Sequence, residues 1–160
     1  MIFLIYIIYA VAYLTIGNSA LPNQLNTPNH LCVTCICHAR TGCFSLQNCA
    51  NYSINYKYWE IAGAPTLSNE SEVNQESYQA CIADDNCIIN TIMRYVEVLN
   101  KKDCICDEMF DCRDKLSLHL YGENCSVKMA RTPQRRYNNC ARRNSLPILD
   151  PNIECVDVDL

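Results

Sequence analysis

The sequence has no excess of basic residues. Its 160 residues include 13 Lys and Arg against 17 Asp and Glu, which gives a formal net charge of −4. Proteins that bind nucleic acid normally carry a basic excess, so the charge balance argues against that class. The hydrophobic share of 49% is ordinary, which excludes disordered and collagen-like chains. The length suits one domain.

Long apolar runs are absent after residue 20. The one candidate, residues 2–16, carries no charge but is shorter than the roughly 20 residues that a membrane-spanning helix needs. It is followed by small residues, GNSA at 17–20, which suit signal peptidase, although no Lys or Arg follows Met1. We predict a signal peptide over 1–20, with an uncleaved membrane anchor as the alternative. No span is predicted in the mature chain, 21–160.

Cysteine is plentiful, with 13 residues, all in the predicted mature chain. Such a density indicates a disulfide scaffold in an oxidising compartment, so we expect a secreted, extracellular protein. Cys32, Cys35 and Cys37 with His38 also have the spacing of zinc ligands. Disulfides are favoured in an exported chain, and no metal or cofactor is predicted. The odd count leaves at least one free thiol or an intermolecular bridge. The cysteines assigned to disulfides are Cys32, Cys35, Cys37, Cys43, Cys49, Cys81, Cys87, Cys104, Cys106, Cys112, Cys125 and Cys140.

Glycosylation sequons agree with export. Three N-x-S/T sequences begin at Asn51, Asn69 and Asn124. The third has Cys in its middle position and is the weakest. We predict glycosylation at Asn51 and Asn69.

Helix signals recur along the chain. Thr27 suits an N-cap before Pro28, an apolar stripe follows over 31–39, and Gly42 supplies the stop. A short helix is predicted over 77–83, and a longer one with Asp85 as its cap. Asp107 is predicted to open another helix, which Gly122 ends. Its inward-facing residues are predicted to be Met109, Phe110, Leu116 and Leu120.

Residues 44–61 have a different period. Tyr52, Ile54, Tyr56 and Tyr58 alternate with mostly polar residues, which is typical of a strand. We therefore predict an α+β fold, mostly helical and disulfide-rich, with a small antiparallel β-hairpin here. The aromatic side chains could form a platform for sugar rings, although alternation would send half of them into the core.

Charge is segregated near the C-terminus. Residues 128–143 hold six Lys and Arg and no acid, whereas residues 150–160 hold four acids and no base. Two explanations stay open. The acidic tail, 145–160, could fold back on a basic face, or the basic residues could bind anionic surfaces such as bacterial wall polymers.

The cysteine spacing resembles that of the invertebrate-type lysozymes, also called the destabilase family. The run from Cys32 to Cys43 is similar to their C-x-x-C-I-C-x-x-E-S-G-C opening, and Cys81-x5-Cys87 to their W-x-x-C-x5-C. The segment 52–59 resembles their F-Q-I-x-x-x-Y-W piece, and Cys112-x6-His119 their C-x6-H. The resemblance implies a lysozyme-like domain over 21–144 with a cleft for peptidoglycan or a chitin-like oligosaccharide. It further implies hydrolysis of the β-1,4 bond between N-acetylmuramic acid and N-acetylglucosamine, and isopeptidase activity in some members.

The catalytic carboxylates of that family are missing. Glycoside hydrolysis normally needs two carboxyl groups that flank the bond. Arg40 stands at the position of the family Glu, and the segment that would carry the family Asp is deleted. Residues 21–59 contain no Asp or Glu, and Glu60 is the first acid of the mature chain.

We therefore predict a non-hydrolytic glycan-binding protein. One alternative is an active lysozyme that uses relocated carboxylates such as Glu60. Others are an isopeptidase, with His119 and Ser117 as an imagined pair, and a scaffold that binds another protein. The residues predicted to contact substrate are Tyr52, Ser53, Tyr58, Trp59, Tyr95 and His119.

Overall fold

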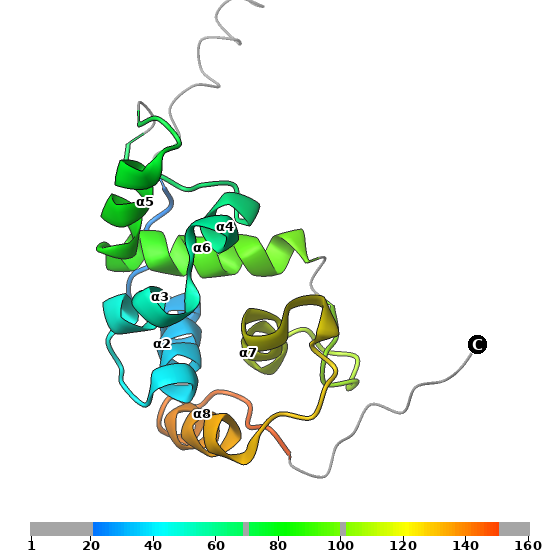
Figure 1. Cartoon of the computed structure of the whole chain (residues 1–160). Coiled ribbons are helices and arrows are strands. Elements are labelled where there is room, and N and C mark those ends of the chain that lie inside the picture. The colour runs from blue at the N-terminus through cyan, green and yellow to red at the C-terminus, as the bar shows by residue number, and fades with distance from the viewer. Residues whose placement is uncertain (1–20, 69–70, 100–101, 151–160) are drawn as a thin grey trace, which may run out of the picture.

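The computed structural model describes residues 21–68, 71–99 and 102–150, and the structural statements below concern these residues. The predicted signal peptide, the sequon at Asn69, Cys155 and residues 151–160 of the predicted acidic tail lie outside them. Within the described part, the chain forms seven α-helices and one 3-10 helix (Figure 1). In chain order these are α2 (Pro28–Thr41), α3 (Leu46–Ser53), α4 (Tyr56–Ile61), α5 (Gln75–Ile82), α6 (Asp85–Val98), α7 (Cys112–Tyr121), η1 (Gly122–Asn124) and α8 (Arg131–Arg143).

Helix α2 lies at the centre of the packing and confirms the predicted signals. The Thr27 hydroxyl accepts a hydrogen bond from the His30 N–H, and Pro28 opens the helix. Gly42 ends it with a left-handed φ of 81°. The helix contacts α3, α6, α7 and α8, and its core-facing residues Val33, Cys35 and Ile36 have no exposed surface. Helix α2 is thus the element around which the others are arranged.

Helix α6 supplies much of the remaining core. Its aliphatic residues Ile88, Ile89, Ile92 and Val96 are wholly buried, as helical spacing predicts. The cap is one residue earlier than predicted, because the Asp84 carboxylate accepts from the Cys87 N–H.

The predicted β-hairpin over 44–61 is wrong, because the structure has two short helices there. Ser45 and Asn55 act as N-caps whose side chains accept from the N–H groups of Asn48 and Tyr58. A break at Ile54 divides the alternating aromatic residues, with Tyr52 on α3 and Tyr56 and Tyr58 on α4. The Cys37–Cys49 disulfide fixes α3 against α2, a tertiary constraint that the alternation pattern does not reveal.

The predicted start of α7 at Asp107 is also wrong. The helix begins at Cys112, after a capping box. The Asp111 carboxylate accepts from backbone N–H groups of the first turn, and the Asp114 carboxylate accepts from the Asp111 N–H. The preceding loop is held by Asp103, whose carboxylate accepts from the N–H groups of Ile105, Cys106 and Glu108. These competing local hydrogen bonds explain the later start. Met109, predicted to pack inward, is 57% exposed, whereas Leu116 is buried as predicted.

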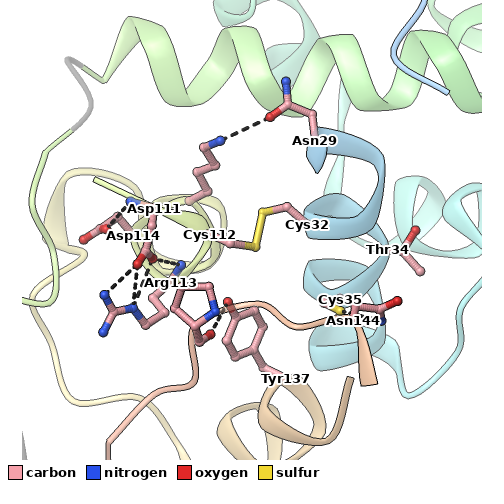
Figure 2. Close-up of a disulfide and its surroundings, with 12 residues drawn as sticks. Asn29, Cys32, Thr34, Cys35, Asp111, Cys112, Arg113, Asp114, Tyr137 and Asn144 are labelled. Atoms are coloured by element: carbon pink, nitrogen blue, oxygen red, sulfur yellow. Dashed lines mark hydrogen bonds and ion pairs between the residues drawn. A yellow bond between two sulfur atoms is a disulfide. The ribbon is translucent and has the colours of Figure 1, made fainter. Parts of the chain in front are cut away.

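Five disulfides join pairs of cysteines that both lie within the described ranges. Figure 2 shows Cys32–Cys112 between α2 and α7, and α2 is further bonded to α8 by Cys35–Cys140. The other three are Cys37–Cys49, Cys81–Cys87 and Cys104–Cys125. Cys106 is also disulfide-bonded. These bonds confirm the predicted scaffold and leave no thiolates on α2 for the alternative zinc site.

One cysteine assignment is wrong. Cys43 is a free, exposed cysteine. It follows Gly42 in the turn after α2, so its side chain lies at the surface, away from the core that holds the ten cysteines of the five bonds named above.

No helix in the described ranges is long and apolar enough to cross a membrane.

Candidate functional site

Three helices bring Tyr58, Tyr95 and His119 together, and we call these residues the Tyr58 cluster. The Tyr58 hydroxyl lies 2.9 Å from His119 Nδ1. The Tyr58 and Tyr95 rings are stacked with centroids 3.7 Å apart, and the His119 ring meets Tyr58 edge-on at 5.5 Å. The sequence separation between Tyr58 and His119 is 61 residues, so only the folded chain creates this arrangement.

Local sequence signals fix each member of the cluster. The Asn55 cap orients the first turn of α4, which carries Tyr58. Tyr95 lies on α6, and His119 in the last turn of α7. Gly122, which ends α7 with a φ of 60°, passes close to Tyr95: a Cβ at this position would lie 3.6 Å from the Tyr95 hydroxyl.

His119 is a neutral, buried imidazole. Burial, helped by the positive charge of Arg40, lowers its pKa to about 4. Burial also raises the pKa of the Tyr58 phenol well above 10, and nearby Tyr95 raises it further, so the hydroxyl keeps its proton. A neutral imidazole and a protonated phenol allow either direction for this hydrogen bond. We assign it with Tyr58 O–H as the donor to Nδ1, which puts the imidazole proton on Nε2.

Nε2 of His119 is the unpaired end of this network. It is buried and has no hydrogen-bond partner in the described part of the chain. Buried polar groups are normally paired, and an exception calls for a ligand, a water or another role. With this assignment, one buried N–H donor lies beside two stacked aromatic rings.

Arg40 lies where the resemblance places the family Glu. Its side chain is exposed in the last turn of α2, and it makes no hydrogen bond or ion pair within the described ranges. Its charge reaches His119, whose pKa it helps to lower. A guanidinium stays protonated at neutral pH and has no acidic proton to give to a leaving oxygen. This position therefore adds positive charge where glycoside hydrolysis would need a protonated carboxyl group.

Three acids are relevant to relocated catalysis. Glu60 is on the surface of α4, 3.6 Å from the Lys57 ammonium in an i,i+3 pair, with 39% of its side chain exposed. Glu123, which the sequence reasoning missed, lies close enough to Tyr95 to raise the pKa of that phenol, in addition to the larger effect of burial. Its position directly after Gly122, at the end of the His119 helix, was the available signal.

Asp114 is the third acid, and burial raises its pKa. The carboxylate has no exposed surface and accepts from the N–H groups of Cys104, Ile105 and Asp111. It therefore holds the 103–111 loop on α7 and does not face a ligand. Among the described residues, no group of three or more His, Cys, Asp or Glu is arranged to hold a metal ion.

The remaining predicted contact residues lie outside the cluster. Tyr52 is 75% exposed at the end of α3, and the Ser53 hydroxyl donates to the Cys49 carbonyl. Trp59 has no exposed surface, and its indole N–H donates to the Pro65 carbonyl. The prediction that Trp59 contacts a glycan is therefore wrong, because this side chain belongs to the core.

The imagined pair of Ser117 and His119 does not form. The two residues are two apart on α7, a spacing that points side chains in different directions. His119 Nδ1 bonds instead to Tyr58.

Comparison with known families identifies the class of protein to which this chain belongs. Residues 29–141 match the family model described as Destabilase, which covers more than half of the chain and places it among the lysozyme-like proteins. The chain belongs to the Destabilase family, the invertebrate-type lysozymes. No curated protein and no solved structure matches it.

Proposed function

We propose that this chain is a secreted member of the family that binds cell-wall glycan at the Tyr58 cluster without hydrolysing it. Two observations together carry the proposal: His119 Nε2–H has no hydrogen-bond partner, and an exposed Arg40 stands at the position of the family's acid. The first is a buried donor, which a sugar oxygen reaches only once the side chains that cover Nε2 move aside. The second withholds the proton that cleavage of the glycosidic bond requires.

Sugar recognition suits the composition of this cluster. Apolar rings with a few placed polar groups are typical of small-ligand sites. Tyr95 is half-buried and so keeps part of its surface for a ligand, while Tyr58 beneath it is 8% exposed. Tyr58 thus acts chiefly as support, because it stacks on Tyr95 and fixes the His119 ring through Nδ1.

Binding is tested by retention of the purified chain on insoluble peptidoglycan and on chitin. In the variant His119→Asn, the Asn Oδ1 replaces Nδ1 as acceptor for Tyr58, while the Nε2 donor is lost. We expect about fivefold weaker retention, the effect of one hydrogen bond of about 1 kcal/mol.

Tyr52→Ala is the matched control, since it removes an exposed aromatic ring that lies outside the cluster. Its retention should equal that of the unmodified chain. Loss with Tyr52→Ala but not with His119→Asn would move the site to α3 and overturn the assignment. Absence of retention on both polymers would reject glycan binding and favour a scaffold that binds protein.

A second candidate is an active lysozyme with relocated carboxylates. Glu123 favours it, because this acid interacts with Tyr95 at the edge of the cluster. Clearing of a suspension of bacterial cell walls by the unmodified chain, lost in Glu123→Gln or Glu60→Gln, would support this candidate. We expect no clearing. Arg40→Glu alone should not restore it, because the second family carboxylate is missing as well.

A further inference from the structure

Helix α8 and the segment that follows it enclose a hollow on a part of the molecule that the Tyr58 cluster does not use. Its volume is about 520 Å³. We call it the α8 hollow. Its lining residues are Arg131, Gln134, Arg135, Asn138, Asn139, Arg142, Ile148, Leu149 and Asp150.

The walls of the α8 hollow are fixed by hydrogen bonds. Both ends of the Asn138 amide bond the backbone of Leu149, with each N···O distance 2.8 Å. The Tyr137 hydroxyl donates to the Pro147 carbonyl at 3.0 Å, and Leu146 N–H donates to the Ala141 carbonyl. The Cys35–Cys140 disulfide anchors α8 itself to α2. The hollow is therefore preformed, which lowers the ordering cost of binding.

Three arginines give the α8 hollow its charge. Arg131 and Arg135 make no ion pair or hydrogen bond within the described ranges, and Arg142 has one long contact, 3.4 Å from Nη1 to the Asn139 Oδ1. With Asp150 as the one acid in the lining, the formal charge is three minus one, or +2. Arginine forks bind phosphate and sulfate oxygens in bidentate geometry.

The spacing of these arginines selects an extended ligand. With a helical rise of about 1.5 Å per residue, Arg131 and Arg135 are separated by about 6 Å along α8, and Arg135 and Arg142 by about 10 Å. A single small anion reaches at most one neighbouring pair, whereas a chain of anions can reach all three. Between the charges, the amides of Gln134 and Asn139 offer donors and acceptors suited to hydroxyl groups.

We propose that the α8 hollow binds a linear anionic polymer of hydroxylated units, polyol or sugar, that carry phosphate or sulfate groups. This site is independent of the proposed glycan contact at His119, since the two share no residue. It gives the basic run at 128–143 a specific role. The start of the predicted acidic tail, 145–160, does fold back on α8: Pro147 and Leu149 are hydrogen-bonded to it, and Asp150 lines the hollow. Residues 151–160 of that tail lie outside the described ranges.

The test compares binding of the full mature chain to poly(glycerol phosphate) and to heparin, which distinguish a phosphate from a sulfate source. The variant Arg131→Gln/Arg135→Gln/Arg142→Gln should bind the preferred polymer about tenfold more weakly, with a shallower dependence on salt. The matched control Lys57→Gln/Arg94→Gln/Lys102→Gln removes the same total charge elsewhere and should retain nearly full affinity.

Two further variants sharpen this test. Asp150→Asn removes the one acid of the lining and should raise affinity. His119→Asn should leave it unchanged, so that failure of this proposal and of the proposed glycan contact are distinguishable. Equal losses in the two triple variants would show a general charge effect and overturn the site. Binding of a single-stranded oligonucleotide or of polyglutamate as tight as that of poly(glycerol phosphate) or heparin would overturn the specificity of the site.

Discussion

Protonation of His119 should destabilise the folded chain as the pH falls from about 7 to 4. The pKa of His119 is lowered to about 4 in the folded state, from 6.5 for an exposed histidine, with burial as the main cause and Arg40 as the second. Between these values the unfolded chain binds a proton that the folded chain does not. The free energy of unfolding therefore falls with decreasing pH in this window.

The size of the effect follows from the two pKa values. Each unit of difference is worth about 1.4 kcal/mol, so the loss is about 1 kcal/mol at pH 6, about 2 at pH 5 and about 3 at pH 4. Denaturant unfolding of the disulfide-bonded chain and of His119→Asn, measured over this range, isolates the contribution. The difference between the two free energies should change by about 3 kcal/mol from pH 7 to pH 4.

The cause of the lowered pKa can be tested by NMR titration of the His119 ring. Tyr58→Phe keeps His119 buried, so the titration midpoint of the ring should stay low. Arg40→Gln removes the smaller of the two causes, so it should raise the midpoint only part of the way toward 6.5. A midpoint near 6.5 in the unmodified chain, or a pH-independent difference from His119→Asn, would refute the reasoning.

Three further predictions concern the scaffold. Replacement of Cys35 and Cys140 by Ala, at a sequence separation of 105, should reduce the free energy of unfolding by about 5 kcal/mol, as measured by denaturant unfolding. Replacement of the Cys81–Cys87 pair, at a separation of 6, should reduce it by about 2 kcal/mol, because a shorter closed loop restricts the unfolded chain less. Equal losses would contradict this dependence on loop length. Cys43 should react with a thiol reagent in the folded, unreduced protein, and peptide mapping should find the label on that residue; a protected Cys43 would contradict the disulfide pattern. Asp114→Ala should cost about 3 kcal/mol or more in the same unfolding assay, because it orphans three N–H donors; a loss below about 1 kcal/mol would contradict its role in holding the 103–111 loop.

Helices with strong local signals could be predicted from the sequence. Helix α2 has a cap, a proline at its first position and a stop glycine, and all three act as predicted. In the segment 44–61 the local signals point to different structures. Its aromatic alternation indicated a strand, but the caps at Ser45 and Asn55 and the bond between Cys37 and Cys49 favour helices. Strand propensity depends strongly on context, and here the tertiary constraints outweighed the aromatic alternation.

The site was only partly predictable for a similar reason. The substitution of the family acid by Arg40 is visible in the sequence, and so is the helix signal that ends beside His119. The burial of Trp59 and the exposure of Tyr52 are not, because adjacent aromatic residues can face the core or the solvent according to packing. The unpaired Nε2 of His119 depends on three helices and becomes visible only when they are assembled.

Release of new reducing ends from purified peptidoglycan tests the central claim most directly. The account predicts that the unmodified chain binds the polymer and releases no reducing ends above the blank, and that Arg40→Glu behaves in the same way. Reducing ends that accumulate with the unmodified chain, and disappear in Glu123→Gln or Glu60→Gln, would contradict it.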